Sequence, residues 1–108
     1  MTFLSDKKCV ACEGDQSPLE ESDILKYQKE LKTFWNVSEN KKIKKEFVFI
    51  NFKEAIKFVN TVADIAEENG HHPDIHIYYN KVIIELWTHA INGLSENDFI
   101  VAAKIEKL

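Results

Sequence analysis

Three histidines in the last third of the chain are the residues with the clearest chemistry. His71 and His72 are adjacent and precede Pro73, and His89 lies at the end of the next apolar run. Imidazole has an unperturbed pKa of about 6.5, so it can give or take a proton near neutral pH. The grouping predicts a pocket that transfers protons, provided that the fold brings the three rings together.

Two strand-like segments around a short turn are expected to position these rings. Segments 75–79 and 82–88 are rich in β-branched and aromatic residues, and only residues 80–81 separate them. Asparagine at position 80 tolerates positive φ, which suits a two-residue hairpin turn. Such a turn pairs Tyr79 with Val82.

Counting outward in this register puts His72 opposite His89, on one face of the hairpin. A slip of one residue would move the two rings to opposite faces. The inner, core face is expected to hold Ile75, Ile77, Tyr79, Val82, Ile84 and Leu86. The outer face is expected to hold His72, His76, Tyr78, Ile83, Glu85, Trp87 and His89. Because Ile83 and Trp87 are apolar, we expect a partner subunit or a ligand to cover part of this outer face. His76 and Glu85 are expected to form a cross-strand surface pair.

The rest of the chain alternates helices and strands. Periodicity predicts helices over 22–33 and 52–69, the second ending at Gly70, and strands over 35–37 and 43–51. Ser95, followed three residues later by Asp98, predicts the start of a final helix. The predicted fold class is α+β, with a single four-stranded antiparallel sheet and helices packed on one face, in the order α-β-β-α-β-β-α.

Composition limits the domain count and the function classes. The 108 residues are expected to form an irregular N-terminal arm over 1–18 and a single domain over 19–108. The net charge is −4 and every basic residue is a lysine, so no bidentate guanidinium is available for bases or phosphates. The lysine cluster at 41–45 is typical of a solvated strand edge, with phosphate contact as the weaker alternative. We therefore expect no direct nucleic-acid binding.

Hydropathy predicts a protein of the cytoplasm. No apolar run approaches the roughly 20 residues that span a bilayer, so no membrane insertion is expected. The first eight residues lack the basic-then-apolar order of a signal peptide. In a reducing compartment Cys9 and Cys12 are expected to be thiols. Their C-x-x-C spacing suits an irregular segment best, and a peripheral metal site or a disulfide remains open.

Four motifs together resemble one family, the pterin-4a-carbinolamine dehydratases. They are Glu67–Asp74 (EENGHHPD), Tyr79–Val82 (YNKV), Thr88-His89 and Gly93–Asp98 (GLSEND). The similarity extends from about Leu31 to the C-terminus. It implies dehydration of 4a-hydroxytetrahydropterin to quinonoid dihydropterin in tetrahydrobiopterin recycling, without a metal or organic cofactor.

The resemblance also implies a set of site residues and partners. His72 and His89 are expected to be the main proton-transfer pair, with His71 as a positioning or second acid/base group. The expected substrate-binding residues are Glu67, Pro73, Thr88, Ala90 and Asp98. Asp98 is expected either to orient a histidine or to act only at the helix N-terminus. The expected assembly is a homodimer or homotetramer, with a functional link to an aromatic amino acid hydroxylase.

Two departures from the family pattern leave an alternative function open. Ala90 stands where the family usually has an acidic residue, and Gly70 stands where Asn or Asp is frequent. The missing acidic residue at Ala90 favours a catalytically weak regulatory or transcriptional-coactivator-like module with the same fold, and the intact His71, His72 and His89 argue against it. A metalloenzyme with histidine ligands is a further alternative, which no motif such as H-E-x-x-H supports.

Overall fold

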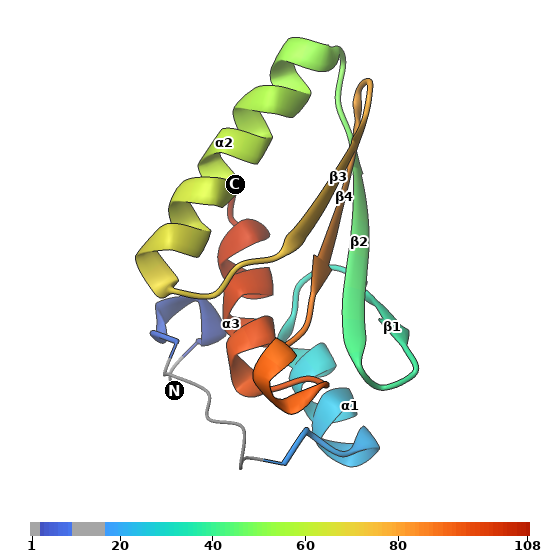
Figure 1. Ribbon diagram of the computed structural model, residues 1–108, viewed down its shortest axis with the longest axis vertical. Coiled ribbons are helices and arrows are strands. Elements are labelled where there is room, and N and C mark those ends of the chain that lie inside the picture. The colour runs from blue at the N-terminus through green and yellow to red at the C-terminus, as the bar shows by residue number, and fades with distance from the viewer. Residues whose placement is uncertain (1–2, 10–16) are drawn as a thin grey trace.

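The structure, a computed structural model, describes residues 3–9 and 17–108, and its elements follow the predicted order (Figure 1). The elements are η1 (Leu4–Asp6), α1 (Glu21–Glu30), β1 (Asn36–Ser38), β2 (Lys42–Val48), α2 (Phe52–Asn69), β3 (Asp74–Tyr78), β4 (Lys81–Leu86), η2 (His89–Ile91) and α3 (Glu96–Ile105). The two short η elements are 3₁₀ helices. The predicted α-β-β-α-β-β-α order is confirmed.

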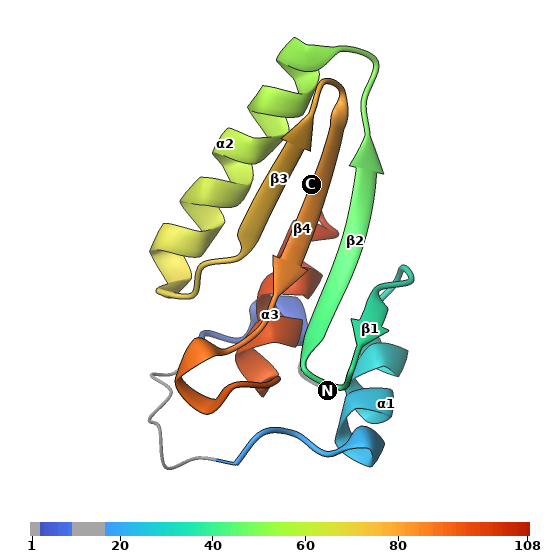
Figure 2. The ribbon, with the colours of Figure 1, turned by 45° about the vertical axis from the view of Figure 1, so that its right-hand side comes forward.

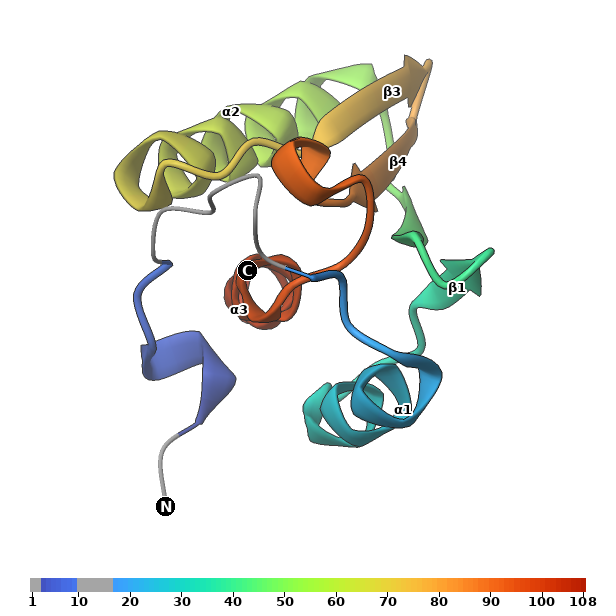
Figure 3. The same cartoon turned by 60° about the horizontal axis from the view of Figure 1, so that its bottom comes forward.

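The four strands form one antiparallel sheet in the order β1-β2-β4-β3 (Figure 2). Two hairpins, β1–β2 and β3–β4, are joined by the pairing of β2 with β4. Figure 3 shows α3 inside the curve of the sheet, with α2 next to β3 and α1 next to β1. The predicted single sheet with helices on one face is therefore confirmed.

Helix α2 shows how local sequence sets the boundaries of an element. The side chain of Asn51 caps the first turn by accepting a hydrogen bond from the backbone N–H of Glu54 at 2.9 Å. Gly70 ends the helix in the left-handed conformation, with φ of 63°, which glycine adopts without steric cost. The helix thus spans the predicted residues 52–69, and its end delivers the chain directly to His71.

The core lies between the inner face of the sheet and helix α3. Alternate residues of β4 are fully buried against the helices, as the predicted inner face requires; they are Val82, Ile84 and Leu86. Helix α3 is buried on most sides, because it contacts α1, α2 and η1 as well as facing the sheet. Burying each large aliphatic side chain contributes about 1.5–3 kcal/mol, so the face assignment of the strands is strongly determined.

The turn of the β3–β4 hairpin differs from the prediction. Tyr78, not Tyr79, starts the turn and pairs with Lys81, so that Ile77 faces Val82. Tyr79 itself adopts a left-handed φ of 53°. Asn80 is held in the turn because its side chain and its backbone carbonyl both bond to the backbone of Phe49, each at 2.8 Å. The shift is two residues, which keeps the paired residues on their predicted faces and changes every cross-strand partner. Tyr79, which was predicted on the inner face, lies in the turn instead and is 68% exposed.

This register overturns the predicted pairing of His72 with His89. β3 starts at Asp74 and β4 ends at Leu86, so neither histidine belongs to a paired strand. His89 instead opens η2, because Thr88 forms an isolated antiparallel bridge with Gly93 and turns the chain back on itself. The two rings reach the same region from loops, without a cross-strand pairing.

The predicted surface pair of His76 and Glu85 survives in another geometry. His76 lies opposite Ile83 in the register, while Asp74 lies opposite Glu85. His76 Nε2 still approaches Glu85 Oε2 to 3.5 Å, because diagonal neighbours on one face of a hairpin are within reach of long side chains.

Two other elements end earlier than predicted. Helix α1 ends at Glu30, and the carboxylate of Glu106 accepts the next free N–H groups, those of Lys32 at 3.0 Å and Thr33 at 2.7 Å. Strand β2 ends at Val48 instead of continuing to residue 51. At the end of α1, this contact with a distant residue ends a pattern that continues in the sequence.

The N-terminal segment packs on the domain. Leu4 in η1 is only 3% exposed and belongs to the core, and η1 contacts α3. The carbonyl of Ser5 accepts a hydrogen bond from Lys104 Nζ at 3.1 Å. Cys12, Gly14 and Asp15, which the sequence analysis placed in the irregular arm, lie outside the described residues. Among the described residues, no helix is long and apolar enough to cross a membrane.

Candidate active site

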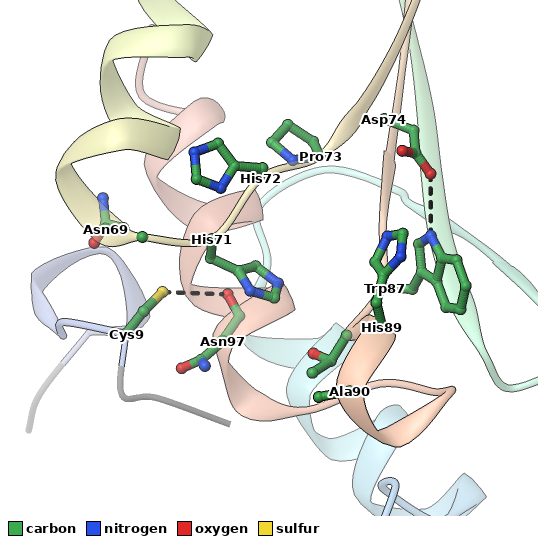
Figure 4. Close-up of a pocket in the computed structure, with 12 residues that line it drawn as sticks. Cys9, Asn69, His71, His72, Pro73, Asp74, Trp87, His89, Ala90 and Asn97 are labelled. Carbon is green, nitrogen blue, oxygen red and sulfur yellow. Dashed lines mark hydrogen bonds between the residues drawn. The ribbon is translucent and has the colours of Figure 1, made fainter. Parts of the chain in front are cut away.

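A cavity of about 590 Å³ lies where the end of α2, the loop before β3, the end of β4 and the start of α3 meet (Figure 4). Six of the residues predicted to form the site line it: His71, His72, Pro73, Thr88, His89 and Ala90. The sequence analysis did not assign six other lining residues to the site: Cys9, Asn69, Gly70, Asp74, Trp87 and Asn97. Glu67 and Asp98 do not line it, but each contacts one of the histidines.

The shortest polar contact at this cavity joins His71 to Asp98. His71 Nε2 lies 2.6 Å from Asp98 Oδ1, and the two side chains are 11% and 0% exposed. The other carboxylate oxygen, Oδ2, accepts hydrogen bonds from the hydroxyl of Thr88 at 2.8 Å and the backbone N–H of Ser95 at 3.0 Å. Three donors therefore converge on a buried carboxylate, which satisfies it without water.

This arrangement assigns a proton to one nitrogen of His71. A carboxylate accepts hydrogen bonds and does not donate them, so the Nε2 that contacts Asp98 carries hydrogen. The other ring nitrogen, Nδ1, is then the one that can exchange a proton with a ligand. A carboxylate behind an imidazole also stabilises the imidazolium that forms when the ring accepts a proton.

The local sequence builds the support for Asp98. Ser95 and Asp98 form a capping box at the start of α3, in which each side chain bonds to the other residue's backbone. The bridge between Thr88 and Gly93 brings the Thr88 hydroxyl to the same point, 2.7 Å from the Ser95 hydroxyl. The expectation that Asp98 contacts a histidine and the expectation that it caps the helix are therefore both met by one carboxylate.

His72 makes a similar contact in a different environment. Its Nε2 lies 2.9 Å from Oε1 of Glu67, in the last turn of α2, with the side chains 59% and 79% exposed. Solvent screens an ion pair at this exposure, and such pairs contribute about 0–1 kcal/mol. His72 thus has a carboxylate partner that orients its ring only weakly.

His89 lies against an aromatic ring. The centroids of the Trp87 and His89 rings are 3.9 Å apart, with 32° between the ring planes. The indole N–H of Trp87 donates to Asp74 Oδ2 at 3.0 Å, a contact drawn in Figure 4. The ammonium of Lys42 lies over the indole, 4.7 Å from its centroid. The three histidines therefore face one cavity with three different supports.

A polar cluster fixes the start of α3 next to the cavity. Oε2 of Glu96 accepts hydrogen bonds from Lys7 Nζ at 2.8 Å and from the Tyr27 hydroxyl at 3.1 Å. Burial, together with the hydrogen bond to Glu96, raises the pKa of Tyr27 to about 12. The same carboxylate raises the pKa of Lys7 above its usual range, first through its hydrogen bond. This cluster joins the N-terminal segment and α1 to the helix that carries Asp98.

The residues that the structure describes contain no group of three or more His, Cys, Asp or Glu side chains arranged as metal ligands. Cys9 contacts the cavity wall, where its thiol donates to the backbone carbonyl of Asn97 at 3.7 Å (Figure 4). The second cysteine of the C-x-x-C, Cys12, lies outside the described residues.

Comparison with known proteins identifies the family. The family model described as pterin 4 alpha carbinolamine dehydratase matches residues 17–108. The chain belongs to this family. A protein of Rickettsia canadensis, provisionally named pterin-4-alpha-carbinolamine dehydratase, is 50% identical over 106 residues, which cover 98% of this chain and 97% of that protein. A relative from Alkaliphilus metalliredigens with the same provisional name is 43% identical and covers 99% and 96%.

Two solved structures share the fold of this dehydratase family. A protein from Brucella melitensis, described as a transcriptional coactivator/pterin dehydratase, has a TM-score of 0.78 and 32% identity, covering 84% of this chain and 97% of its own. A pterin dehydratase-like protein described as a RuBisCO assembly factor of the alpha-carboxysome has a TM-score of 0.60 and 24% identity, covering 70% and 89%. At this identity the second likeness shows the fold alone.

Proposed function

We propose that this chain dehydrates a 4a-hydroxytetrahydropterin to the quinonoid dihydropterin, as a step of tetrahydrobiopterin recycling, by general acid/base catalysis from its histidines. The observation that supports this most directly is the convergence of three imidazoles on one cavity, one of them held by the buried carboxylate of Asp98. Membership of the pterin carbinolamine dehydratase family supports the reaction and the substrate class.

The reaction needs two proton transfers. The bond between the ring carbon and its hydroxyl oxygen breaks, and a general acid must protonate the leaving oxygen so that water departs. The neighbouring ring nitrogen loses its proton to a base, and its electrons form the new carbon–nitrogen double bond. Each well-placed acid or base typically contributes about 10²–10⁴-fold in rate. An imidazole pair with one protonated and one neutral ring supplies both groups at one pH.

The geometry favours His71 as one member of this pair. The hydrogen bond to Asp98 orients its ring and leaves Nδ1 as the nitrogen that can exchange a proton. The sequence analysis expected His72 and His89 as the main pair, and the register removes the cross-strand pairing that supported this choice. Both rings still line the cavity, so each remains a candidate for the second member of the pair.

The remaining site residues are proposed to bind or enclose the pterin. Pro73, Thr88 and Ala90 line the cavity, whereas Glu67 reaches it through His72 and Asp98 through His71. Ala90 offers a methyl group where an acidic side chain is usual in the family. We therefore expect weaker substrate binding and an unchanged type of reaction.

The test is the dehydration rate of freshly generated 4a-hydroxytetrahydropterin, followed by absorbance. Wild type is expected to accelerate the reaction, with a loss of about 10²–10⁴-fold in His71→Ala. His72→Ala and His89→Ala, measured alongside, identify the second group as the one with the next largest loss. No wild-type acceleration above the uncatalysed rate would refute the proposal.

The second candidate function is a regulatory or coactivator-like module with weak catalysis. Two observations favour it: Ala90 in place of an acidic residue, and the description of the Brucella melitensis structure as a transcriptional coactivator/pterin dehydratase. The same assay separates the two functions, because a purely regulatory protein gives no turnover.

We further propose that the protein acts in the cytoplasm as a homodimer or homotetramer, beside an aromatic amino acid hydroxylase. Exposed apolar side chains support self-association; they include Val48, Ile50, Phe52 and Tyr79. Light scattering coupled to size exclusion tests this, and a monomer at micromolar concentration would contradict it.

A further inference from the structure

Trp87 is the half-buried aromatic side chain that covers one wall of the cavity. It follows the last residue of β4 and points to the same face as Glu85, since side chains alternate along a strand. Asp74 lies opposite Glu85 and is thus the diagonal neighbour of Trp87 on that face. The sheet therefore places the indole and the carboxylate together before any ligand is present.

Two contacts from different strands hold the indole. Asp74 on β3 accepts its N–H at 3.0 Å, and Lys42 on β2 puts an ammonium 4.7 Å from its centroid. A cation over an indole face contributes about 0.5–1 kcal/mol at an exposed site, and the hydrogen bond to a charged acceptor fixes the ring in its plane. An indole held at its edge and over its face is a rigid surface.

His89 lies against this surface. It opens the short η2 helix in the loop after β4, it is exposed, and its ring lies 3.9 Å from the indole centroid. His71 and His72 each contact a carboxylate, whereas His89 contacts the indole ring of Trp87. An exposed imidazole on a loop would otherwise exchange among rotamers within nanoseconds.

We propose that Trp87 is a positioning residue, which holds the His89 ring towards the cavity and is itself held by Asp74 and Lys42. The consequence for turnover rests on the proposed dehydratase function, whereas the positioning does not. Trp87 acts through His89: it limits the orientations of the imidazole, so that a proton-transfer group meets the substrate without first being ordered.

The experiment combines nuclear magnetic resonance of the imidazole with kinetics on the full-length protein. A stacked indole shifts the ring protons of His89 upfield through its ring current, and His89→Gln identifies that resonance by removing it. We compare wild type with Trp87→Phe, which keeps an aromatic face, and with Trp87→Leu, which removes it. Tyr78→Leu is the matched control, because it removes an exposed aromatic ring from the same face of the hairpin, outside the cavity.

The expected result is an upfield His89 resonance in wild type, a smaller shift in Trp87→Phe and none in Trp87→Leu. Tyr78→Leu should leave the resonance and kcat/KM unchanged. In the dehydration assay, Trp87→Leu should lose about 2- to 12-fold in kcat with little change in KM, the size expected for one aromatic pair, and Trp87→Phe should recover most of it. Asp74→Ala should lower the shift, and Asp74→Asn, which keeps an acceptor, should restore it.

The outcomes separate the inference from the function it serves. An unshifted wild-type resonance, or a shift that persists in Trp87→Leu, would overturn the positioning role. If Trp87→Leu fails to fold, as its amide spectrum would show, Trp87→Phe and the two Asp74 variants carry the same comparison. A wild type with the predicted shift and no turnover would uphold the positioning and refute the dehydratase proposal.

Discussion

The two sides of the cavity hold their histidines in opposite ways. On the enclosed side, His71 contacts an Asp98 carboxylate that is 0% exposed and that also accepts hydrogen bonds from Thr88 and Ser95. On the open side, His72 contacts Glu67, whose side chain is 79% exposed, and His89 lies on an indole. The partners are chemically alike in the two carboxylate contacts, so the difference between them is one of environment.

Burial makes the same contact worth different amounts. Removing one partner of a buried hydrogen bond costs about 1–3 kcal/mol for each polar group left without a partner, whereas an exposed pair contributes about 0–1 kcal/mol. The enclosed side can therefore fix the orientation and protonated nitrogen of His71 in advance. On the open side, the rings of His72 and His89 can adjust to a ligand as it enters and leaves.

The most direct test of the difference between the two sides is to remove the charge of each carboxylate without changing the shape of its side chain. Asp98→Asn is expected to lower kcat/KM by about 10²–10⁴-fold, because both carboxylate oxygens accept hydrogen bonds and an amide nitrogen can replace neither of them, and because the ring loses its charged imidazolium partner. His71→Ala should lose a similar factor, measured in the dehydration assay. The double variant should be no worse than His71→Ala alone, and additive losses would show that Asp98 acts elsewhere.

Stability gives a second measure of the enclosed side. Asp98→Ala is expected to lower the free energy of unfolding by about 2–6 kcal/mol, since the Thr88 hydroxyl and the Ser95 N–H each lose a buried acceptor. Denaturant unfolding measures this difference. Asp64→Ala on the exposed side of α2 is the matched control and should stay within about 0.5 kcal/mol of wild type. Equal values for the two variants would mean that water replaces the lost carboxylate.

The enclosed side could be predicted in part from sequence, because its signals are local. Ser95 and Asp98 have the spacing of a capping box, and Gly70 has the position of a helix C-cap. The start of α3 and the end of α2 therefore followed from short-range rules. What those rules do not contain is the contact of Asp98 with His71, 27 residues away. That contact was expected only from the resemblance to a family.

The open side was harder to predict because it depends on long-range packing. The sequence between the strands allows turns at residues 79–80 and at 80–81, and the contacts of Asn80 with Phe49 on the preceding loop decide between them. A two-residue shift preserves the alternation of apolar residues, so the pattern that fixed the faces could not fix the partners. Asp74 and Trp87 share a face in either register, directly opposite in the predicted one and diagonal in the observed one, so their contact follows from the faces and not from the exact partners.

Variants in the N-terminal segment test whether the packing of η1 on α3 stabilises the domain that carries the enclosed side. Leu4→Ala is expected to lower the free energy of unfolding by about 2 kcal/mol, near the low end for a buried leucine because η1 lies at the surface. Phe3→Ala, next to it and 63% exposed, is the control and should have a small effect. Denaturant midpoints of the two variants, compared at equal slope, give the difference. A similar loss in both would place the stabilising contact in the backbone of the segment.

The smallest expected effect lies on the open side and decides the comparison. Glu67→Gln, the counterpart of Asp98→Asn, is expected to change kcat/KM by no more than about fivefold, because an exposed pair contributes at most about 1 kcal/mol. The amide oxygen can still accept the Nε2 hydrogen of His72, and water can replace it. Rates for the two amide variants, measured on the same pterin, give the ratio directly. A loss in Glu67→Gln as large as in Asp98→Asn would mean that the substrate, once bound, excludes water from His72 and Glu67, so that both sides are enclosed during the reaction.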